Sequence, residues 1–380
     1  MEVYEDLLNW AKEQGIELHG IEPRPLPGRG IGVVATKSIK ENDILLKVPT
    51  SSLRTSKTVC KEVSSRLPTG TRVHGLLAAD FLLNKQPNYA PWNAVLPSRE
   101  DVWASMPLTW DRHLHEFLPP SARQLLKKQE AKFDRDWQAV HNAFPQISRA
   151  DYLYAWALVN TRTFYYDGGG SSSNGKKPPP HDCMALQPVA DLLNHHPTQG
   201  AKVTFSAEGC AIRATKTYSP GEEIYICYGN HGNDFLLTEY GFLLDENKWD
   251  EICLDEAILP ELSGRQKDML ADEDFLGNYM LDSNGVCYRT LVALRLLALS
   301  LIEWRRYLDG PFNVDDEVQQ GEVDRELARI LEKYRRGTIA KMIGKIEEST
   351  AGEESQRKML IRRWEQIGEL IDRTIENLRV

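Results

Sequence analysis

The stretch from Asp182 to Asn247 constrains the fold more than any other part of the chain, because it combines short strand patterns with most of the chemically informative side chains. It carries the motif DLLNHH at residues 191–196 and a predicted strand at residues 224–228. Three tyrosines occur in and after this strand: Tyr225, Tyr228 and Tyr240. Side chains of a strand alternate between its two faces. Tyr225 and Tyr228 are therefore expected to point in opposite directions, with Tyr225 in the core and Tyr228 at a site.

Patterns on either side of this stretch divide the chain into regions. Residues 33–49 contain two runs rich in β-branched residues, which predict a β-hairpin. From residue 71 to 166, apolar residues recur three and four positions apart, as they do in amphipathic helices. Three long amphipathic helices are predicted near the C-terminus, at residues 288–308, 322–346 and 353–378. A chain of 380 residues is longer than the usual length that folds around one hydrophobic core, so more than one domain is expected. The changes of pattern along the chain divide it into residues 1–70, 71–166, 167–247 and 248–380.

The composition argues against several classes of protein. The net charge of −9 and the isoelectric point near 5.6 argue against nucleic-acid binding, which needs a concentrated cationic surface. No run of about 18 apolar residues is present, so no membrane-spanning helix is expected. The 6 cysteines lie far apart without a CxxC pair, which favours reduced thiols and argues against a cysteine zinc site. We expect an intracellular protein of the cytoplasm, with the nucleus as a second location.

Several familiar site patterns do not fit the sequence. The glycines at residues 28–32 have the spacing GxGxG and precede a predicted strand, whereas a dinucleotide fingerprint precedes a helix. Residues 170–177 nearly match a phosphate loop, but Lys177 stands where serine or threonine is required and three prolines follow. No GxSxG nucleophile motif occurs. Five side chains could ligate a metal, yet they lack the spacing of a known site, so no metal is expected. These five are His181, Asp191, His195, His196 and His231.

Five short segments, taken in order, resemble a known family. They are residues 28–39 (GRGIGVVATKSI), 161–164 (TRTF), 191–195 (DLLNH), 221–224 with 228–229 (GEEI and YG), and 233–242. Their order and spacing resemble the SET-domain protein methyltransferases, in the branch typified by the Rubisco large-subunit lysine methyltransferase, over nearly the whole chain. The resemblance implies an α+β protein: a SET β-fold with a pseudoknot, an inserted helical subdomain, and a mainly α-helical C-terminal domain.

This resemblance implies a site for S-adenosylmethionine, with S-adenosylhomocysteine as product. The residues that it assigns to the cofactor are Arg29, Gly30, Ile31, Arg162, Asp191, Asn194, His195, Tyr228 and Phe242. It implies that the backbone at positions 29–31 lines the cofactor and that Arg162 contacts its polar end. Asn194 and His195 match the family's NH pair, whose backbone and amide hold the adenine, and Phe242 would pack against the same ring.

The resemblance also implies a channel for the substrate lysine, in which Tyr228 matches the catalytic tyrosine and Tyr240 forms a second wall. Phe164 stands where the histidine-methylating member of the branch has an asparagine, which favours lysine as the target. A lysine ammonium has a solution pKa near 10.4, so the neutral amine costs roughly 4.6 kcal/mol at pH 7. A dry aromatic channel lowers this cost because it disfavours the charged form. Tyr228 is therefore expected to orient the amine and stabilise charge, and not to act as a base.

The predicted function is an S-adenosylmethionine-dependent protein-lysine N-methyltransferase that acts on a non-histone intracellular protein. The sequence lacks the post-SET cysteine cluster that binds zinc, and the resemblance implies that the C-terminal helices grip the substrate instead. Between Asp250 and Asp274, nine carboxylates face only two cationic side chains. A solvated surface is the simplest interpretation of this segment, and a basic partner such as a ribosomal or translation-related protein is the functional interpretation. Two alternatives stay open: a protein-histidine methyltransferase, and a non-catalytic SET-like module that binds proteins.

Overall fold

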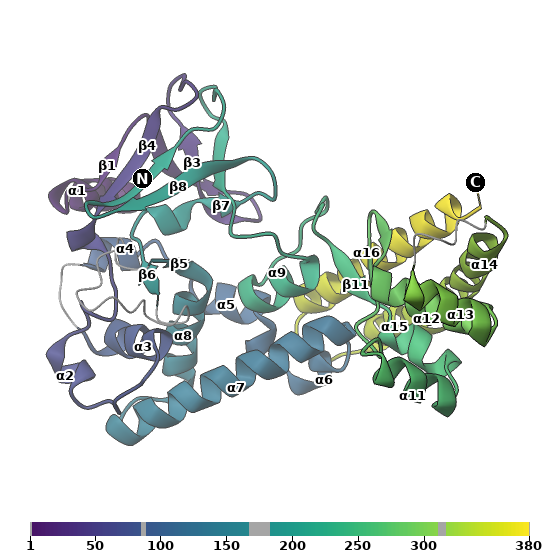
Figure 1. Ribbon diagram of the computed structural model, residues 1–380. Coiled ribbons are helices and arrows are strands. Elements are labelled where there is room, and N and C mark those ends of the chain that lie inside the picture. The colour runs from purple at the N-terminus through teal and green to yellow at the C-terminus, as the bar shows by residue number, and fades with distance from the viewer. Residues whose placement is uncertain (1, 85–88, 167–182, 311–316, 380) are drawn as a thin grey trace. The chain divides into compact units, whose positions relative to one another are not determined.

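The computed structural model describes residues 2–84, 89–166, 183–310 and 317–379 (Figure 1). They form two compact units. The first unit comprises residues 1–109 and 127–230, and the second unit comprises residues 110–126 and 231–380. The sequence patterns predict a boundary at residue 247, whereas residues 231–247 pack with the second unit. The near-match to a phosphate loop at residues 170–177 and the candidate ligand His181 lie outside the described residues.

The first unit is built on a β-sheet whose described strands, eight in all, follow the order β1-β4-β9-β8-β10-β3-β2, with β7 paired to β10 (Figure 1). The strands are β1 (Glu17–Leu18), β2 (Ile21–Leu26), β3 (Gly30–Ala35), β4 (Ile44–Pro49), β7 (Asn194–His195), β8 (Gly200–Ser206), β9 (Gly209–Arg213) and β10 (Glu223–Ile226). β3 pairs with β2 and β10, whereas β4 pairs with β1 and β9. The hairpin predicted at residues 33–49 is therefore wrong. Both strands form, but β-propensity does not determine which strands pair.

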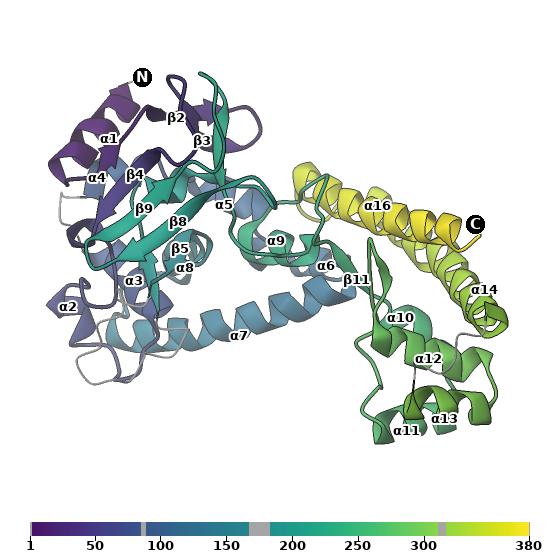
Figure 2. The same ribbon diagram turned by 45° about the horizontal axis from the view of Figure 1, so that its top comes forward.

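Helices of the first unit supply side chains to the same hydrophobic core as the sheet. They are α1 (Glu2–Glu13), α2 (Lys61–Ser64), α3 (Val73–Leu83), α4 (Ala90–Asn93), α5 (Arg99–Ser105), α8 (Arg149–Arg162) and the larger part of α7 (Pro120–Ala143), which starts in the second unit. α8 begins after Ser148, whose hydroxyl accepts from the backbone N–H of Asp151 (3.0 Å). Trp92 and Trp156 are buried in the same core as the sheet side chains. Figure 2 shows α1 next to α4.

The second unit is mainly helical and has a small sheet in the order β11-β12-β13. Its elements are α6 (Arg112–His115), α9 (Asn233–Tyr240), β11 (Glu251–Cys253), α10 (Asp255–Ile258), α11 (Gly264–Asp272), β12 (Met280–Asp282), β13 (Gly285–Val286), α12 (Tyr288–Ala298), α13 (Leu301–Asp309), α14 (Glu317–Tyr334), α15 (Ala340–Glu348) and α16 (Glu354–Asn377). The helix predicted at residues 288–308 is two helices, because Ser300 caps α13 through a capping box with Glu303. The other two form as predicted, and a π-helical turn at Arg335–Ile339 joins α14 to α15.

A buried arginine explains why α9 packs against α16. The side chain of Arg363 is 0% exposed, and it donates from Nε to Asp234 and from Nη1 to Asp250, both at 2.7 Å. Gln366, further along α16, accepts a hydrogen bond from the side-chain amide of Asn233 (2.9 Å). These bonds join positions far apart in the sequence, so α9 becomes part of the C-terminal helical unit.

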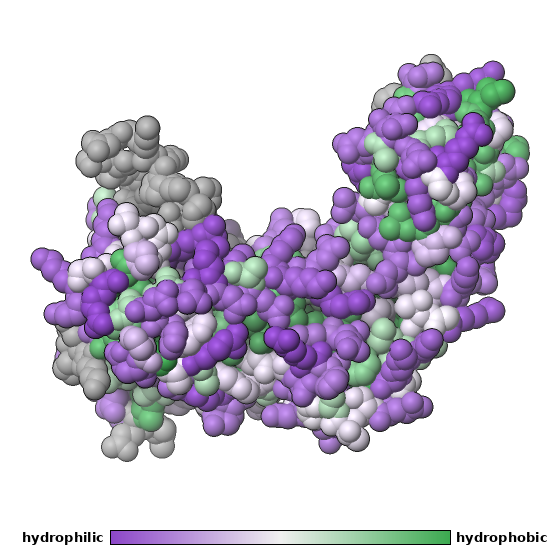
Figure 3. All heavy atoms as spheres, turned by 90° about the horizontal axis from the view of Figure 1, so that it is seen from below, coloured by the Kyte–Doolittle hydropathy of each residue, from purple (hydrophilic) through white to green (hydrophobic). Residues whose placement is uncertain are grey.

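The surface carries mainly polar side chains. On the face shown in Figure 3, hydrophilic residues predominate, with smaller groups of hydrophobic residues between them. In the described part of the chain, every helix is too short or too polar to cross a bilayer.

Candidate active site

The DLLNHH motif and the strand before Tyr228 lie side by side in the first unit. β7 pairs in parallel with β10, so that Asn194 lies opposite Tyr225 and His195 lies opposite Ile226. A short 3-10 helix at Ala190–Leu192 leads into β7 and carries the aspartate of the DLLNHH motif. Two segments separated by about thirty positions in sequence are thus adjacent in space, and the side chains at their ends define the site.

Tyr228 follows β10 directly and is held by two hydrogen bonds. Its backbone N–H donates to Nδ1 of His195 (3.0 Å), and its hydroxyl donates to the carbonyl of Leu193 (2.8 Å). The ring centroids of Tyr228 and His195 are 5.0 Å apart. Because Nδ1 accepts a hydrogen bond, the neutral imidazole carries its proton on Nε2. His195 and the carbonyl of Leu193 therefore hold the predicted catalytic tyrosine in place.

A second group joins Arg162, Asp191 and Trp92. Arg162 donates from Nη1 to the backbone carbonyl of Asp191 (2.7 Å), and the indole N–H of Trp92 lies 3.2 Å from both carboxylate oxygens of Asp191. The Asp191 side chain is 0% exposed, and this burial raises its pKa although Arg162 and Trp92 oppose the shift. Nε of Arg162 is buried, and no described residue offers it a hydrogen-bond partner. Such an atom is costly to leave unsatisfied, so it fits the anionic end of a bound ligand.

The glycine-rich turn between β2 and β3 lies against the same strands. Gly30 has φ +70°, a conformation that favours glycine. A Cβ added to Gly32 would lie 2.3 Å from Cδ1 of Leu26, 2.9 Å from Oε1 of Glu223 and 3.0 Å from Nδ2 of Asn194, so these side chains would have to shift. The backbone at Gly32 is thus in close contact with the side chains of Glu223 and Asn194. It places the predicted cofactor loop, residues 29–31, next to the NH pair.

Glu223 is the centre of a polar group that the sequence patterns did not predict. Its Oε1 accepts from Nδ2 of Asn194 (2.8 Å), and its Oε2 pairs with Nη2 of Arg29 (2.8 Å). Tyr225 donates from its hydroxyl to Oε2 (2.7 Å) and accepts from Nη1 of Arg29 (3.0 Å). The prediction that Tyr225 is a core residue is wrong, because its half-buried phenol completes this group. Glu223 and Tyr225 are two positions apart on one strand, and this spacing could have revealed their shared face.

The remaining predicted site residues belong to other elements. Phe164 lies in β5 (Thr163–Tyr165), which pairs with β6 (Met184–Leu186), and its half-buried ring packs on the core of the first unit. Tyr240 and Phe242 belong to the second unit, with ring centroids 6.2 Å apart. Burial raises the pKa of Tyr240 to about 12, so its phenol is protonated at neutral pH. A channel that combines Tyr228 with Tyr240 stays a prediction.

The candidate metal ligands are engaged in other interactions. Nδ1 of His196 accepts from the backbone N–H groups of Thr198 (3.1 Å) and Gln199 (3.0 Å). His231 stacks on Phe235, with ring centroids 4.0 Å apart. Among the residues that the structure describes, no three His, Cys, Asp or Glu side chains form a group that could hold a metal ion.

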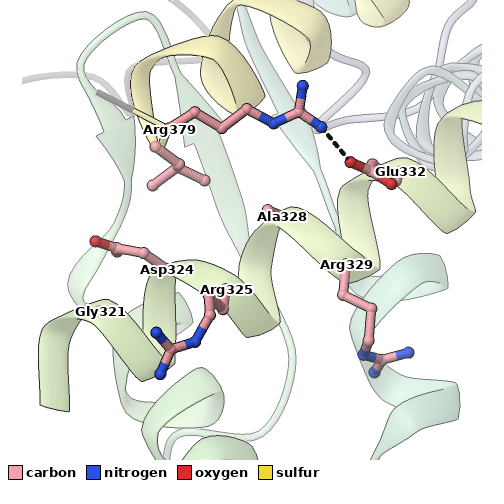
Figure 4. A pocket seen from close by; sticks show the side chains of 8 residues that line it. Gly321, Asp324, Arg325, Ala328, Arg329, Glu332 and Arg379 are labelled. Atoms are coloured by element: carbon pink, nitrogen blue, oxygen red, sulfur yellow. Dashed lines mark hydrogen bonds and ion pairs between the residues drawn. The ribbon is translucent and has the colours of Figure 1, made fainter. Parts of the chain in front are cut away.

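A cavity of about 510 Å³ lies between α14 and the end of α16 in the second unit (Figure 4). It is lined by Gly321, Asp324, Arg325, Ala328, Arg329, Glu332, Leu378 and Arg379. Arg379 pairs with Glu332 (2.6 Å), and Arg329 pairs with Glu261 (2.6 Å). None of the predicted site residues lines this cavity, so it gives no support to a cofactor site there.

Comparison with known proteins agrees with the arrangement along β10. Residues 30–229 match the family model of the SET domain, and residues 250–377 match the model described as Ribosomal lysine N-methyltransferase 2 C-terminal domain. The chain belongs to the SET-domain family. The SET-domain match begins at Gly30 and ends just after Tyr228, so it includes the polar groups described above except for Arg29. Residues 230–249, which include Tyr240, lie between the two matched regions.

Two relatives and one solved structure show how far the likeness extends. Ribosomal lysine N-methyltransferase set11 of Schizosaccharomyces pombe is 30% identical over 299 residues, which cover 78% of this chain and 75% of the relative. SET domain-containing protein 4 of Homo sapiens is 27% identical over 337 residues, which cover 80% of this chain and 75% of that protein. A structure of Rubisco LSMT bound to AdoMet has a TM-score of 0.62 at 17% identity and covers 99% of this chain and 91% of its own. The predicted α+β fold, with a SET sheet and a helical C-terminal region, is confirmed.

Proposed function

We infer that this protein is an S-adenosylmethionine-dependent protein-lysine N-methyltransferase. The observation that carries the inference is the proximity of three features in a SET domain: the Arg162–Asp191 pair just before β7, the Asn194–His195 pair on β7, and Tyr228 at the end of β10. The lysine methyltransferase named among the relatives supports the reaction class. S-Adenosylmethionine supplies an electrophilic methyl group when it is bound.

Residues of the first unit fit the cofactor at two places. The buried Nε of Arg162 suits the cofactor carboxylate, because a guanidinium bonds carboxylates strongly. The glycine-rich turn brings its backbone to within contact of Asn194, where it can line an elongated ligand. These two places account for the anionic end and one flank of the cofactor.

Tyr228 is placed to orient the substrate amine. Its hydroxyl proton is donated to the carbonyl of Leu193, so its oxygen acts toward a substrate as an acceptor. An acceptor can hold an amine N–H and thereby align the nitrogen lone pair with the methyl group. Tyr228 is therefore an orienting residue, and the substrate proton leaves by another route, such as solvent.

As the substrate we propose a ribosomal or other translation-related protein, with the cytoplasm as the main location and the nucleus as the second. The names of the relative set11 and of the matched C-terminal model support this substrate class. The acidic segment gives less support than its sequence suggests, because four of its carboxylates already pair with cationic side chains of the second unit. These four are Asp250, Glu256, Glu261 and Glu273.

The test is methylation of purified ribosomal proteins with labelled S-adenosylmethionine. Wild-type protein should label a lysine, located by mass spectrometry. The Tyr228→Phe variant should bind S-adenosylmethionine within about twofold of wild type, yet transfer should fall by about 100-fold, in the range typical of one lost transition-state contact. Transfer at the wild-type rate by the Phe variant would disprove the role of Tyr228.

The same assay separates the two alternative functions. Label on histidine would identify a protein-histidine methyltransferase, which the phenylalanine at position 164 argues against. Cofactor binding without transfer to any ribosomal or lysate protein would identify a non-catalytic SET-like module.

A further inference from the structure

The carboxylate of Glu223 determines how the amide of Asn194 is turned. An ionised carboxylate can only accept hydrogen bonds, so the Asn194 atom that lies 2.8 Å from Oε1 must be the NH₂ group. The carbonyl oxygen Oδ1 of Asn194 then faces away from Glu223. The bond to Glu223 uses one N–H of the Asn194 amide, so the carbonyl oxygen Oδ1 stays available as an acceptor on the opposite side.

The same carboxylate neutralises Arg29 on the cofactor loop. The Glu223 side chain is 8% exposed, whereas that of Arg29 is 53% exposed, so the acid is the fixed member of the pair. The hydrogen bond with Tyr225 and the charge of Glu223 raise the pKa of Arg29, against the effect of desolvation. Without Glu223, a full positive charge would remain beside residues 29–31.

From these two effects we propose that Glu223 is a positioning residue for the cofactor. It turns the carbonyl oxygen of Asn194 toward the cofactor and cancels the charge of Arg29 beside it. This rests on the proposed function, because the ligand is S-adenosylmethionine. That ligand carries one more positive charge than S-adenosylhomocysteine, owing to its sulfonium. The charge of Arg29, when it is unpaired, repels the first ligand and not the second.

The proposal predicts a change in ligand preference for Glu223→Gln. Isothermal titration should show S-adenosylmethionine binding about tenfold weaker than in wild type, which corresponds to about 1.4 kcal/mol. The loss for S-adenosylhomocysteine should be at least about threefold smaller, because only the amide orientation is affected. The KM for S-adenosylmethionine should rise accordingly, while the KM for the protein substrate stays at the wild-type value.

Glu222→Gln is the matched control. Glu222 is the neighbouring acid and pairs with Lys216 (2.6 Å), so its loss removes the same charge without touching Arg29 or Asn194. It should leave both affinities unchanged. Glu223→Asp keeps the charge but shortens the side chain, so it should weaken both ligands by the same factor. This second variant also decides the question if Glu223→Gln does not fold.

The outcomes separate the two hypotheses. Equal losses for both ligands in Glu223→Gln, wild-type affinity in that variant, or an altered ligand preference in Glu223→Asp would overturn the role of Glu223. If wild-type protein binds neither ligand, the proposed function itself fails, whatever the variants do.

Discussion

Replacing Arg363 with methionine tests the buried pairing that holds α9 on α16. The arginine side chain is 0% exposed, and its partners Asp234 and Asp250 are 8% and 15% exposed. Methionine fills part of the same space but provides no donor. Two largely buried carboxylates would then lose their shared cation, each from a hydrogen bond of 2.7 Å.

The expected cost follows from the burial. Removing one partner of a buried ion pair typically lowers the free energy of unfolding by about 3–5 kcal/mol. For a unit of this size, each kcal/mol lowers the melting temperature by roughly 2–4 °C, so the second unit should melt about 6–20 °C lower. Differential scanning calorimetry measures this directly, and the transition of the first unit serves as an internal reference.

The loss of stability in the Arg363→Met variant should be smaller at lower pH. Burial raises the pKa of Asp234, and the charge of Arg363 opposes this shift. Without the arginine, the pKa of Asp234 in the folded protein should rise further above its unfolded value. The folded state then binds more protons than the unfolded state, so stability increases as the pH falls through the folded pKa. The deficit relative to wild type should therefore shrink when the pH is lowered from 7 to 5.

Arg362→Met is the matched control on the same helix. Arg362 is 35% exposed and pairs at the surface with Glu369 (2.7 Å) and Asp245 (3.1 Å). Exposed pairs of this kind contribute at most about 1 kcal/mol. An equal loss of stability in the two variants would refute the reasoning, as would a deficit of Arg363→Met that grows on acidification.

Two further predictions concern the first unit. Gly32→Ala would place a methyl group against Leu26, Glu223 and Asn194, so S-adenosylmethionine affinity should fall by about tenfold or more in isothermal titration, whereas unchanged affinity would show that these side chains can move aside. Trp92→Phe removes the indole donor from the buried carboxylate of Asp191 and should lower the unfolding free energy by about 1–3 kcal/mol in urea titration, with no loss expected if the carboxylate finds another donor.

Some features of the site could be predicted from local patterns because they depend on short-range chemistry. The cap at Ser148 is one example, and the strands at both ends of the SET domain are another. The break at Ser300 was missed although the capping box Ser-x-x-Glu is present, because the apolar periodicity continues across it. The apolar periodicity predicts one continuous helix and the capping box predicts a new helix start, and the structure shows that the capping box determines the boundary.

Other features depended on contacts that no local pattern encodes. Tyr225 is an aromatic residue in a strand of a mainly apolar sheet, so burial in the core was the simplest expectation. Its hydroxyl belongs to a polar group instead, because it accepts a hydrogen bond from Arg29, which lies 196 positions away in the sequence. The contact of Glu223 with Asn194 is also long-range, because the two residues are 29 positions apart in the sequence.

The family, the α+β architecture and the motifs could be predicted from the amino-acid sequence, because the order and spacing of five short segments resemble those of the SET-domain methyltransferases. The pairing of the strands, the end of the first unit, and the side chains that contact Asn194, His195 and residues 29–31 are visible only in the folded chain. Strand pairing and buried ion pairs depend on contacts between residues that are far apart in the sequence. A strand can pair with any strand beside which the fold places it, and a buried charge such as Arg363 is tolerated only where the fold brings carboxylates to it.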